Sequence, residues 1–366
     1  MQWKEKLMRP FDLYAVSEIR PYLMGIATLW VTLYHSKYVN LFNSSFLTGT
    51  RLLGIFTRID AIGNCAVDLF FFLSGLGLYF SYSRLLESDL HPLKAFYHRR
   101  FRRILPTILI VTILTYGLIE VENLANWAGY VFLYGFLTPT LERGNFWYFS
   151  FTVVLYLVFP LIHRSIRGKR GRLGAAAWIL ASVTAAIMMS IFAEKYFYMR
   201  GILMLCRIPV FVLGAYMGKL CLRHQKIPVW IPVLAVPASI LLLVLINDCP
   251  LSPSYLRFYE YCILVLLIAL GHGLIFSRFS KRGFLSRAVM LFGSYSMEIY
   301  LLYESIYNNG TDLFNSPDNT GLVYALTAFT ATLVLAVLLK FVAGQLTHAF
   351  DAQGSLPARK KEGVSS

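Results

Sequence analysis

Apolar stretches of about 20 residues recur along the whole chain, and each is long enough to cross a lipid bilayer as one helix. Only 14% of the 366 residues are charged, whereas soluble domains carry about 25%. A helix satisfies its own backbone hydrogen bonds in lipid, so the pattern predicts an all-α, polytopic membrane bundle of about ten transmembrane helices. The predicted spans are residues 21–41, 61–82, 104–122, 146–163, 173–192, 202–220, 228–246, 258–276, 288–307 and 321–342.

Two basic segments set the direction of these spans, because Lys and Arg accumulate on the cytoplasmic side of a membrane. The segments HPLKAFYHRRFRR (91–103) and HRSIRGKRGR (163–172) are both predicted to be cytoplasmic, so an even number of crossings separates them. Residues 124–141 form a short stretch with two glycines and a proline, which we predict to be re-entrant or to return to its own side. The result is a multi-pass protein of the inner (plasma) membrane with both termini in the cytoplasm.

The chain reads as a single transmembrane domain, residues 1–342, followed by a polar cytoplasmic tail, 343–366, that is predicted to be disordered. The Lys and Arg residues that produce the net charge of +15 are concentrated in the predicted cytoplasmic loops. This distribution therefore indicates a lipid bilayer as partner and no nucleic acid. The five cysteines occur singly, without the spacing of a metal site, so no metal is predicted.

Ionisable residues within the predicted spans are functional candidates, because a charge in lipid is costly. His35, near the outer end of the first span, can take a proton from a hydroxyl or accept an acyl group, or it simply bonds two helices together. Asp68, in GNCAVDLFFFLSGLGLYF, needs a partner, which is either His35 or a basic residue of another span. The small residues around Ser74 suit close approach of a helix or a ligand.

A basic cluster precedes the third predicted span, in FYHRRFRRILP, and contains Arg99, Arg100 and Arg103. Such a cluster either contacts anionic lipid heads or binds the phosphates of a nucleotide-bearing donor through its guanidinium groups. Arg20, at the inner end of the first span, is either an interfacial arginine that snorkels or a member of the same site.

Four further residues are candidates for contact with an acceptor. Trp147 and Tyr148, in NFWYFSFTVVLYLVFP, either belong to an aromatic belt or stack on a sugar ring. In GSYSMEIYLLYES, Glu298 is predicted to face the interior of the bundle, and Tyr303 lies further out on the same span.

Together these motifs resemble the acyltransferase-3 family of integral-membrane O-acyltransferases. The matching segments, in chain order, are IATLWVTLYH, GNCAVDLFFFLSGLGLYF, RRFRRILP, NFWYFSFTVVLYLVFP and GSYSMEIYLLYE. The resemblance implies transfer of an acyl group, typically acetyl, from cytoplasmic acyl-CoA to a hydroxyl of a cell-surface or extracellular glycan or glycolipid. His35 matches the family's histidine, Asp68 and Ser74 match its aspartate followed by Ser-Gly, and Arg100 and Arg103 match its arginines.

The chain departs from the family pattern at two positions. Met24 stands where the family has an arginine before the histidine, and Arg20, one turn away on nearly the same face, is the candidate to replace it. Tyr303 replaces a histidine often found in the ninth span. Two other classes stay open from the residues: a transporter or flippase of a glycan or lipid-linked precursor, and an inactive relative that serves as a scaffold or sensor.

Overall fold

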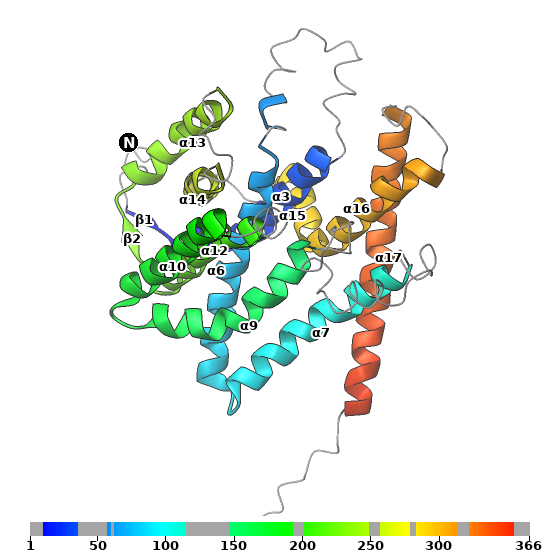
Figure 1. Cartoon of the computed structure of the whole chain (residues 1–366), viewed down its shortest axis with the longest axis horizontal. Helices are drawn as coiled ribbons and strands as arrows, with labels where there is room; N and C mark the ends of the chain where they lie inside the picture. The colour runs from blue at the N-terminus through cyan, green and yellow to red at the C-terminus, as the bar shows by residue number, and fades with distance from the viewer. Residues whose placement is uncertain are drawn as a thin grey trace, which may run out of the picture.

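The computed structural model describes residues 10–35, 57–59, 62–114, 147–192, 201–248, 257–278, 283–313 and 322–354 (Figure 1). Within these residues the elements are helices, apart from one antiparallel pair of two-residue strands, β1 (Phe11–Asp12) and β2 (Lys226–Ile227). The helices are α2 (Tyr14–Glu18), α3 (Arg20–His35), α6 (Asn64–Ser88), α7 (Pro92–Thr112), α9 (Trp147–Arg167), α10 (Gly171–Phe192), α12 (Ile208–Leu222), α13 (Trp230–Asp248), α14 (Arg257–Arg278), α15 (Phe284–Ser294), α16 (Ser296–Leu313) and α17 (Leu322–Gly354).

Six helices of the described part are long and apolar enough to cross a membrane, so the chain is an all-α membrane protein. They are Asn64–Ser88, Trp147–Arg167, Gly171–Phe192, Gly201–Leu222, Tyr259–Ser277 and Thr327–His348. Each overlaps one predicted span, and α13 covers the predicted span 228–246 as a shorter apolar helix. The predicted spans 21–41 and 104–122 run past the described residues, and 124–141 lies outside them, so the number of about ten spans stays a prediction.

The ninth predicted span, 288–307, is wrong as a single helix. The structure has two helices there, α15 and α16, which are interrupted at Tyr295. The break follows a close crossing of α15 and α3. A Cβ on Gly293 would lie 2.2 Å from the Pro21 carbonyl oxygen, and one on Gly25 would lie 1.8 Å from the Val289 carbonyl oxygen. Apolar periodicity does not record such a contact, which is why the sequence suggested one continuous span.

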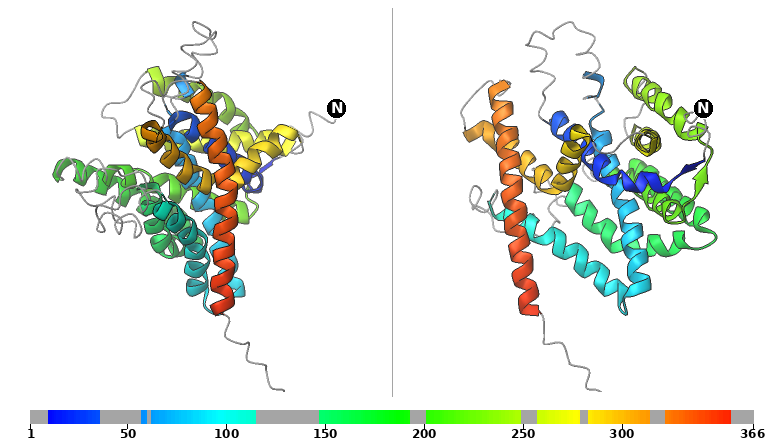
Figure 2. Two further views of the ribbon diagram at one scale, coloured as in Figure 1. Left: turned by 90° about the vertical axis from the view of Figure 1, so that its right-hand side faces the viewer. Right: turned by 180° about the vertical axis from the view of Figure 1, so that it is seen from behind.

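The boundaries of two other helices also differ from the prediction. The third predicted span began at residue 104, whereas α7 begins at Pro92, a favourable residue for the first turn of a helix, and includes the whole basic cluster. α17 continues to Gly354, past residue 342, the predicted end of the last span. It stands as one long straight helix at the edge of the molecule, beside α7 and α16 (Figure 2).

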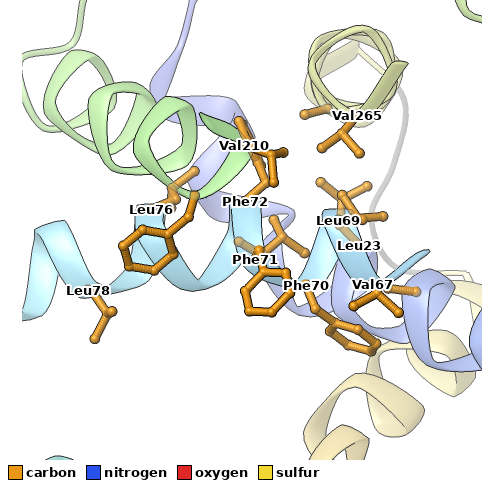
Figure 3. Close-up of a cluster of buried hydrophobic side chains, with 14 of the residues drawn as sticks. Leu23, Val67, Leu69, Phe70, Phe71, Phe72, Leu76, Leu78, Val210 and Val265 are labelled. Carbon is orange, nitrogen blue, oxygen red and sulfur yellow. The ribbon is translucent and has the colours of Figure 1, made fainter. Parts of the chain in front are cut away.

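α6 forms the centre of the fold and packs against α3, α7, α9, α12 and α14. Its buried side chains meet Leu23 of α3, Val210 of α12 and Val265 of α14 (Figure 3). The backbones of α6 and α12 touch through reciprocal glycines. A Cβ on Gly75 would lie 2.2 Å from the Phe211 carbonyl oxygen, and one on Gly214 would lie 2.0 Å from the Phe72 carbonyl oxygen. The small residues predicted to allow close approach therefore include one that allows helix packing.

Candidate active site

A cavity of about 270 Å³ lies among α3, α6, α7, α9 and α16. Its lining includes five of the residues predicted from sequence to bind donor or acceptor: Arg20, Ser74, Arg100, Arg103 and Tyr148. We call it the arginine cavity. Along α6 its lining extends from Leu78 to Phe70, a distance of roughly 12 Å at 1.5 Å per residue. It therefore follows the helix axis toward Asp68.

Arg20, the first residue of α3, is fixed in the arginine cavity by the backbone of α6. Its Nε donates a hydrogen bond to the Leu73 carbonyl oxygen at 2.9 Å. Gly77 leaves the space that the guanidinium group occupies, because a Cβ there would lie 2.7 Å from Arg20 Cζ. Met24 lines the same cavity. Arg20 thus brings its charge to the cavity that contains the position of the missing family arginine.

Arg100 and Arg103 enter the arginine cavity from α7, one turn apart. Arg100 Nη2 donates to Ser81 Oγ, and its Cζ lies 5.7 Å from the centre of the Phe96 ring. Arg100 Nε is buried and has no hydrogen-bond partner among the described residues. A buried donor of this kind is costly unless a ligand accepts its hydrogen bond, so it indicates a binding site.

Arg99 does not join this group. It lines a second cavity of about 400 Å³ on another side of α7, which also contains Glu298 and which Arg103 borders as well. Neighbouring residues of an α-helix point about 100° apart, at 3.6 residues per turn, so Arg99 and Arg100 must face different sides. The predicted basic cluster therefore divides between two cavities.

Asp68 is completely buried near the start of α6, and its partner there is an arginine of another helix. Arg207, the N-cap residue of α12, places its Nε 3.7 Å from Asp68 Oδ1. The Arg207 guanidinium lies 4.8 Å from the Trp147 ring centre, and its Nη1 donates to the Leu203 carbonyl oxygen at 2.9 Å. Neither carboxylate oxygen of Asp68 accepts a hydrogen bond from the described side chains or backbone of other residues.

The side chain of His35 lies outside the described residues, so its predicted contact with Asp68 stays a prediction. The backbone of its helix is described. The end of α3 that carries His35 lies against the start of α6, since Asn64 Nδ2 donates to the Tyr34 hydroxyl at 3.4 Å. Asp68 is one turn further along α6. His35 and Asp68 therefore belong to the same end of the α3–α6 pair, and Arg20 lies at the other end of α3, roughly 22 Å away along the axis.

Of the remaining predicted residues, Tyr148 lines the arginine cavity, whereas Trp147 and Tyr303 are not among its described lining residues. Tyr148 packs against Phe71 and Tyr300, with ring centres 5.0 Å and 5.3 Å apart. Trp147 lies at the Asp68–Arg207 pair, and Tyr303 is buried on α16 with 3% of its surface exposed. Sequence reasoning missed Arg207 and Tyr300. Arg207 had the same signal as Asp68, an ionisable residue within an apolar stretch, whereas Tyr300 had none.

Comparison with known proteins gives the family. The family model described as an acyltransferase domain matches residues 22–341 of this chain. No curated protein and no solved structure is significantly similar to it. In the part of the chain that the structure describes, no group of three or more His, Cys, Asp or Glu side chains could hold a metal ion. The match covers most of the sequence, from α3 into α17, and the chain thus belongs to the acyltransferase-3 family and is a membrane acyltransferase.

Proposed function

We propose that this protein transfers an acyl group, acetyl in the simplest case, from cytoplasmic acyl-CoA to a hydroxyl of a cell-surface or extracellular glycan or glycolipid. The observation that supports it most is the convergence of Arg20, Arg100 and Arg103 on one cavity from two helices far apart in the sequence. Three guanidinium groups with one unpartnered buried donor suit a ligand that carries phosphates.

The donor enters from the arginine end. Its phosphates pair with Arg20, Arg100 and Arg103, and Ser74 contacts the arm that carries the acyl group. The lining of the cavity from Leu78 to Phe70 gives this arm a path along α6 toward Asp68. Arg20 replaces the family arginine that is missing at Met24.

The chemistry occurs at the end of α3 that carries His35. In direct transfer, the imidazole takes the proton of the acceptor hydroxyl, the oxygen attacks the thioester carbonyl, and the carbon–sulfur bond breaks to release the coenzyme as a thiol. In the two-step alternative, the imidazole attacks the thioester carbonyl, the carbon–sulfur bond breaks to release the coenzyme as a thiol, and the acceptor hydroxyl then displaces the imidazole from the acyl group. In both, Asp68 stabilises the positive charge that develops on His35, and Arg207, whose Nε lies 3.7 Å from Asp68 Oδ1, holds the carboxyl group in place.

The acceptor approaches from the opposite, outer side. Trp147 and Tyr148 offer aromatic faces for a sugar ring, and Tyr303 lies further along the neighbouring helix α16. Glu298 was a candidate for the acceptor from its sequence position. It lines the second cavity with Arg99, and so we do not assign it to the acceptor.

The test is incubation of the purified full-length protein in proteoliposomes with radiolabelled acetyl-CoA and a panel of surface glycans. Label recovered on the glycan as a hydroxylamine-sensitive ester supports the proposal, and His35→Ala is expected to abolish it. Movement of glycan across the membrane without consumption of acetyl-CoA would favour a flippase instead. Transfer that survives His35→Ala would contradict both forms of the chemistry.

A further inference from the structure

The second cavity, of about 400 Å³, is bordered by α7, α16 and α17 and has a strongly cationic lining. Arg99, Arg102 and Arg103 contribute to it from α7, and Lys340 contributes from α17. Glu298 is the one carboxylate among its described lining residues. We call this space the basic cavity.

The cations of the basic cavity come from two helices and line one common space. Arg99, Arg102 and Arg103 are spaced at i, i+3 and i+4, which brings them to one face of α7. Lys340 is fixed opposite them, because its Nζ donates to the Ser294 carbonyl oxygen at 2.5 Å and lies 4.2 Å from the centre of the Tyr295 ring. The carboxylate residue Glu298 is only 5% exposed. The charged groups that the cavity exposes are therefore mainly cationic.

Like charges in one cavity repel each other, so an anion that fills the cavity stabilises the arrangement. The anion must be compact and highly charged to use several of these side chains at once. A phosphate monoester fits, since it carries a charge of about −1.5 to −2 at neutral pH and three acceptor oxygens. Arginine forks bind such oxygens in pairs.

The basic cavity adjoins the arginine cavity. Arg103 and Met297 line both of them, so one elongated ligand can occupy the two together. A coenzyme A thioester has the required shape: an acyl arm, a diphosphate and, at the far end of the nucleotide, a separate phosphate monoester. The arm and diphosphate belong in the arginine cavity, which leaves the monoester for the basic cavity.

We propose that the basic cavity binds the 3′-phosphate of the donor's nucleotide, so that the protein distinguishes coenzyme A from 3′-dephospho-coenzyme A. This inference rests on the proposed function. An anionic lipid headgroup presents the same phosphate chemistry, and the experiment must separate the two sources.

The experiment compares the affinities of the purified full-length protein for coenzyme A and 3′-dephospho-coenzyme A, by titration calorimetry in a neutral detergent. We expect coenzyme A to bind at least tenfold more tightly. Arg102→Gln and Lys340→Gln should each reduce this ratio at least threefold. Lys169→Gln is the matched control, since Lys169 is exposed on the loop between α9 and α10 and lines neither cavity. Thermal unfolding of each variant verifies that it is folded.

Equal binding of the two coenzymes to the unmodified protein, or a ratio that both substitutions leave unchanged, overturns this inference and leaves the proposed function intact. Absence of binding by either coenzyme overturns both. The lipid source is tested by native mass spectrometry after purification from membranes with phosphatidylglycerol. If Arg102→Gln and Lys340→Gln release that lipid while the two coenzymes bind equally, the cavity holds a lipid headgroup and the assignment to the nucleotide is wrong.

Discussion

At the scale of single residues, the site depends on side chains that are held by backbone hydrogen bonds and by the space that glycines leave free. Arg20 is directed by one carbonyl oxygen of α6 and by the space above Gly77. The carboxylate of Asp68 is buried with Arg207 as its partner, and without hydrogen bonds from the described neighbours it is poorly stabilised in the ground state. Such a group is available to interact with a reacting partner.

The role of Arg20 can be tested by moving the charge within its cavity. Arg20→Met is expected to weaken coenzyme A binding at least tenfold, because a guanidinium–phosphate pair is lost. Adding Met24→Arg to that variant should restore most of the affinity, since both positions line the same cavity. Calorimetric titration of the two variants and the unmodified protein measures this. Arg20→Met with unchanged affinity would exclude Arg20 from donor binding.

The Asp68–Arg207 pair gives a prediction on stability. Arg207→Met should destabilise the protein by about 3 kcal/mol, because it leaves the buried carboxyl group of Asp68 without its arginine partner. Asp68→Asn combined with Arg207→Met should be more stable than Arg207→Met alone. Thermal unfolding in detergent measures both, with exposed Arg172→Met as a control that is expected within about 0.5 kcal/mol of the unmodified protein. A double variant less stable than the single one would show that Asp68 does not depend on Arg207.

At the scale of helices, close crossings set the architecture. α6 touches α12 through Gly75 and Gly214, and α3 touches α15 through Gly25 and Gly293. The second crossing coincides with the break at Tyr295 that directs α16, with Tyr300, toward the arginine cavity. Glycines in a span thus indicate where two helices cross closely, just as charged residues in a span indicate a functional site.

The α6–α12 crossing predicts that replacing glycine by alanine changes the stability differently at Gly214 and at Gly344. Gly214→Ala should destabilise by about 1–3 kcal/mol, because its Cβ would lie 2.0 Å from a carbonyl oxygen and the helices must separate. Gly344→Ala on α17 meets nothing within 4 Å and should be neutral or stabilise by up to roughly 1 kcal/mol through helix propensity. Thermal unfolding measures both, and similar values for the two would argue against the crossing.

The sequence predicted which segments form helices better than it predicted which way the side chains of each helix face. It predicted a membrane bundle, the apolar helices and the residues Arg20, Arg100 and Ser74 that lie around one cavity. It did not separate Arg99 from Arg100, because rotation of a helix about its axis depends on what packs against it. It left the partner of Asp68 open for the same reason, since Arg207 is brought to it only by the path of the chain before α12.

At the scale of the whole molecule, the proposed reaction needs two entrances on opposite sides of the membrane. The donor end of α3 carries Arg20, and the other end carries His35. Arg99, Arg102 and Lys340 line the basic cavity, which adjoins the arginine cavity at this donor end. The antiparallel packing of α3 and α6 places Arg20 and His35 at opposite ends of α3, as the proposed separate access of donor and acceptor requires.

This arrangement predicts sidedness for engineered thiols in a variant whose native cysteines are replaced. A cysteine in place of Arg99 should react with an impermeant maleimide only from the cytoplasmic side, and coenzyme A should protect it. A cysteine in place of His35 should react only from the opposite side. Labelling of right-side-out and inverted vesicles measures both reactions. Reaction of the two positions from one side would contradict transfer across the membrane.

The continuity of α3 has a consequence for the choice of activated acyl compound. A helix cannot shorten, so the roughly 22 Å between Arg20 and His35 is a fixed gap. Acetyl phosphate or an acetyl adenylate, held at the arginines by its phosphate, would leave its carbonyl beside that phosphate and far from the imidazole. In the proposed reaction, a carrier with a long flexible stem between its anionic head and its reactive carbon bridges this gap, so we expect reach, rather than chemical activation, to select the donor.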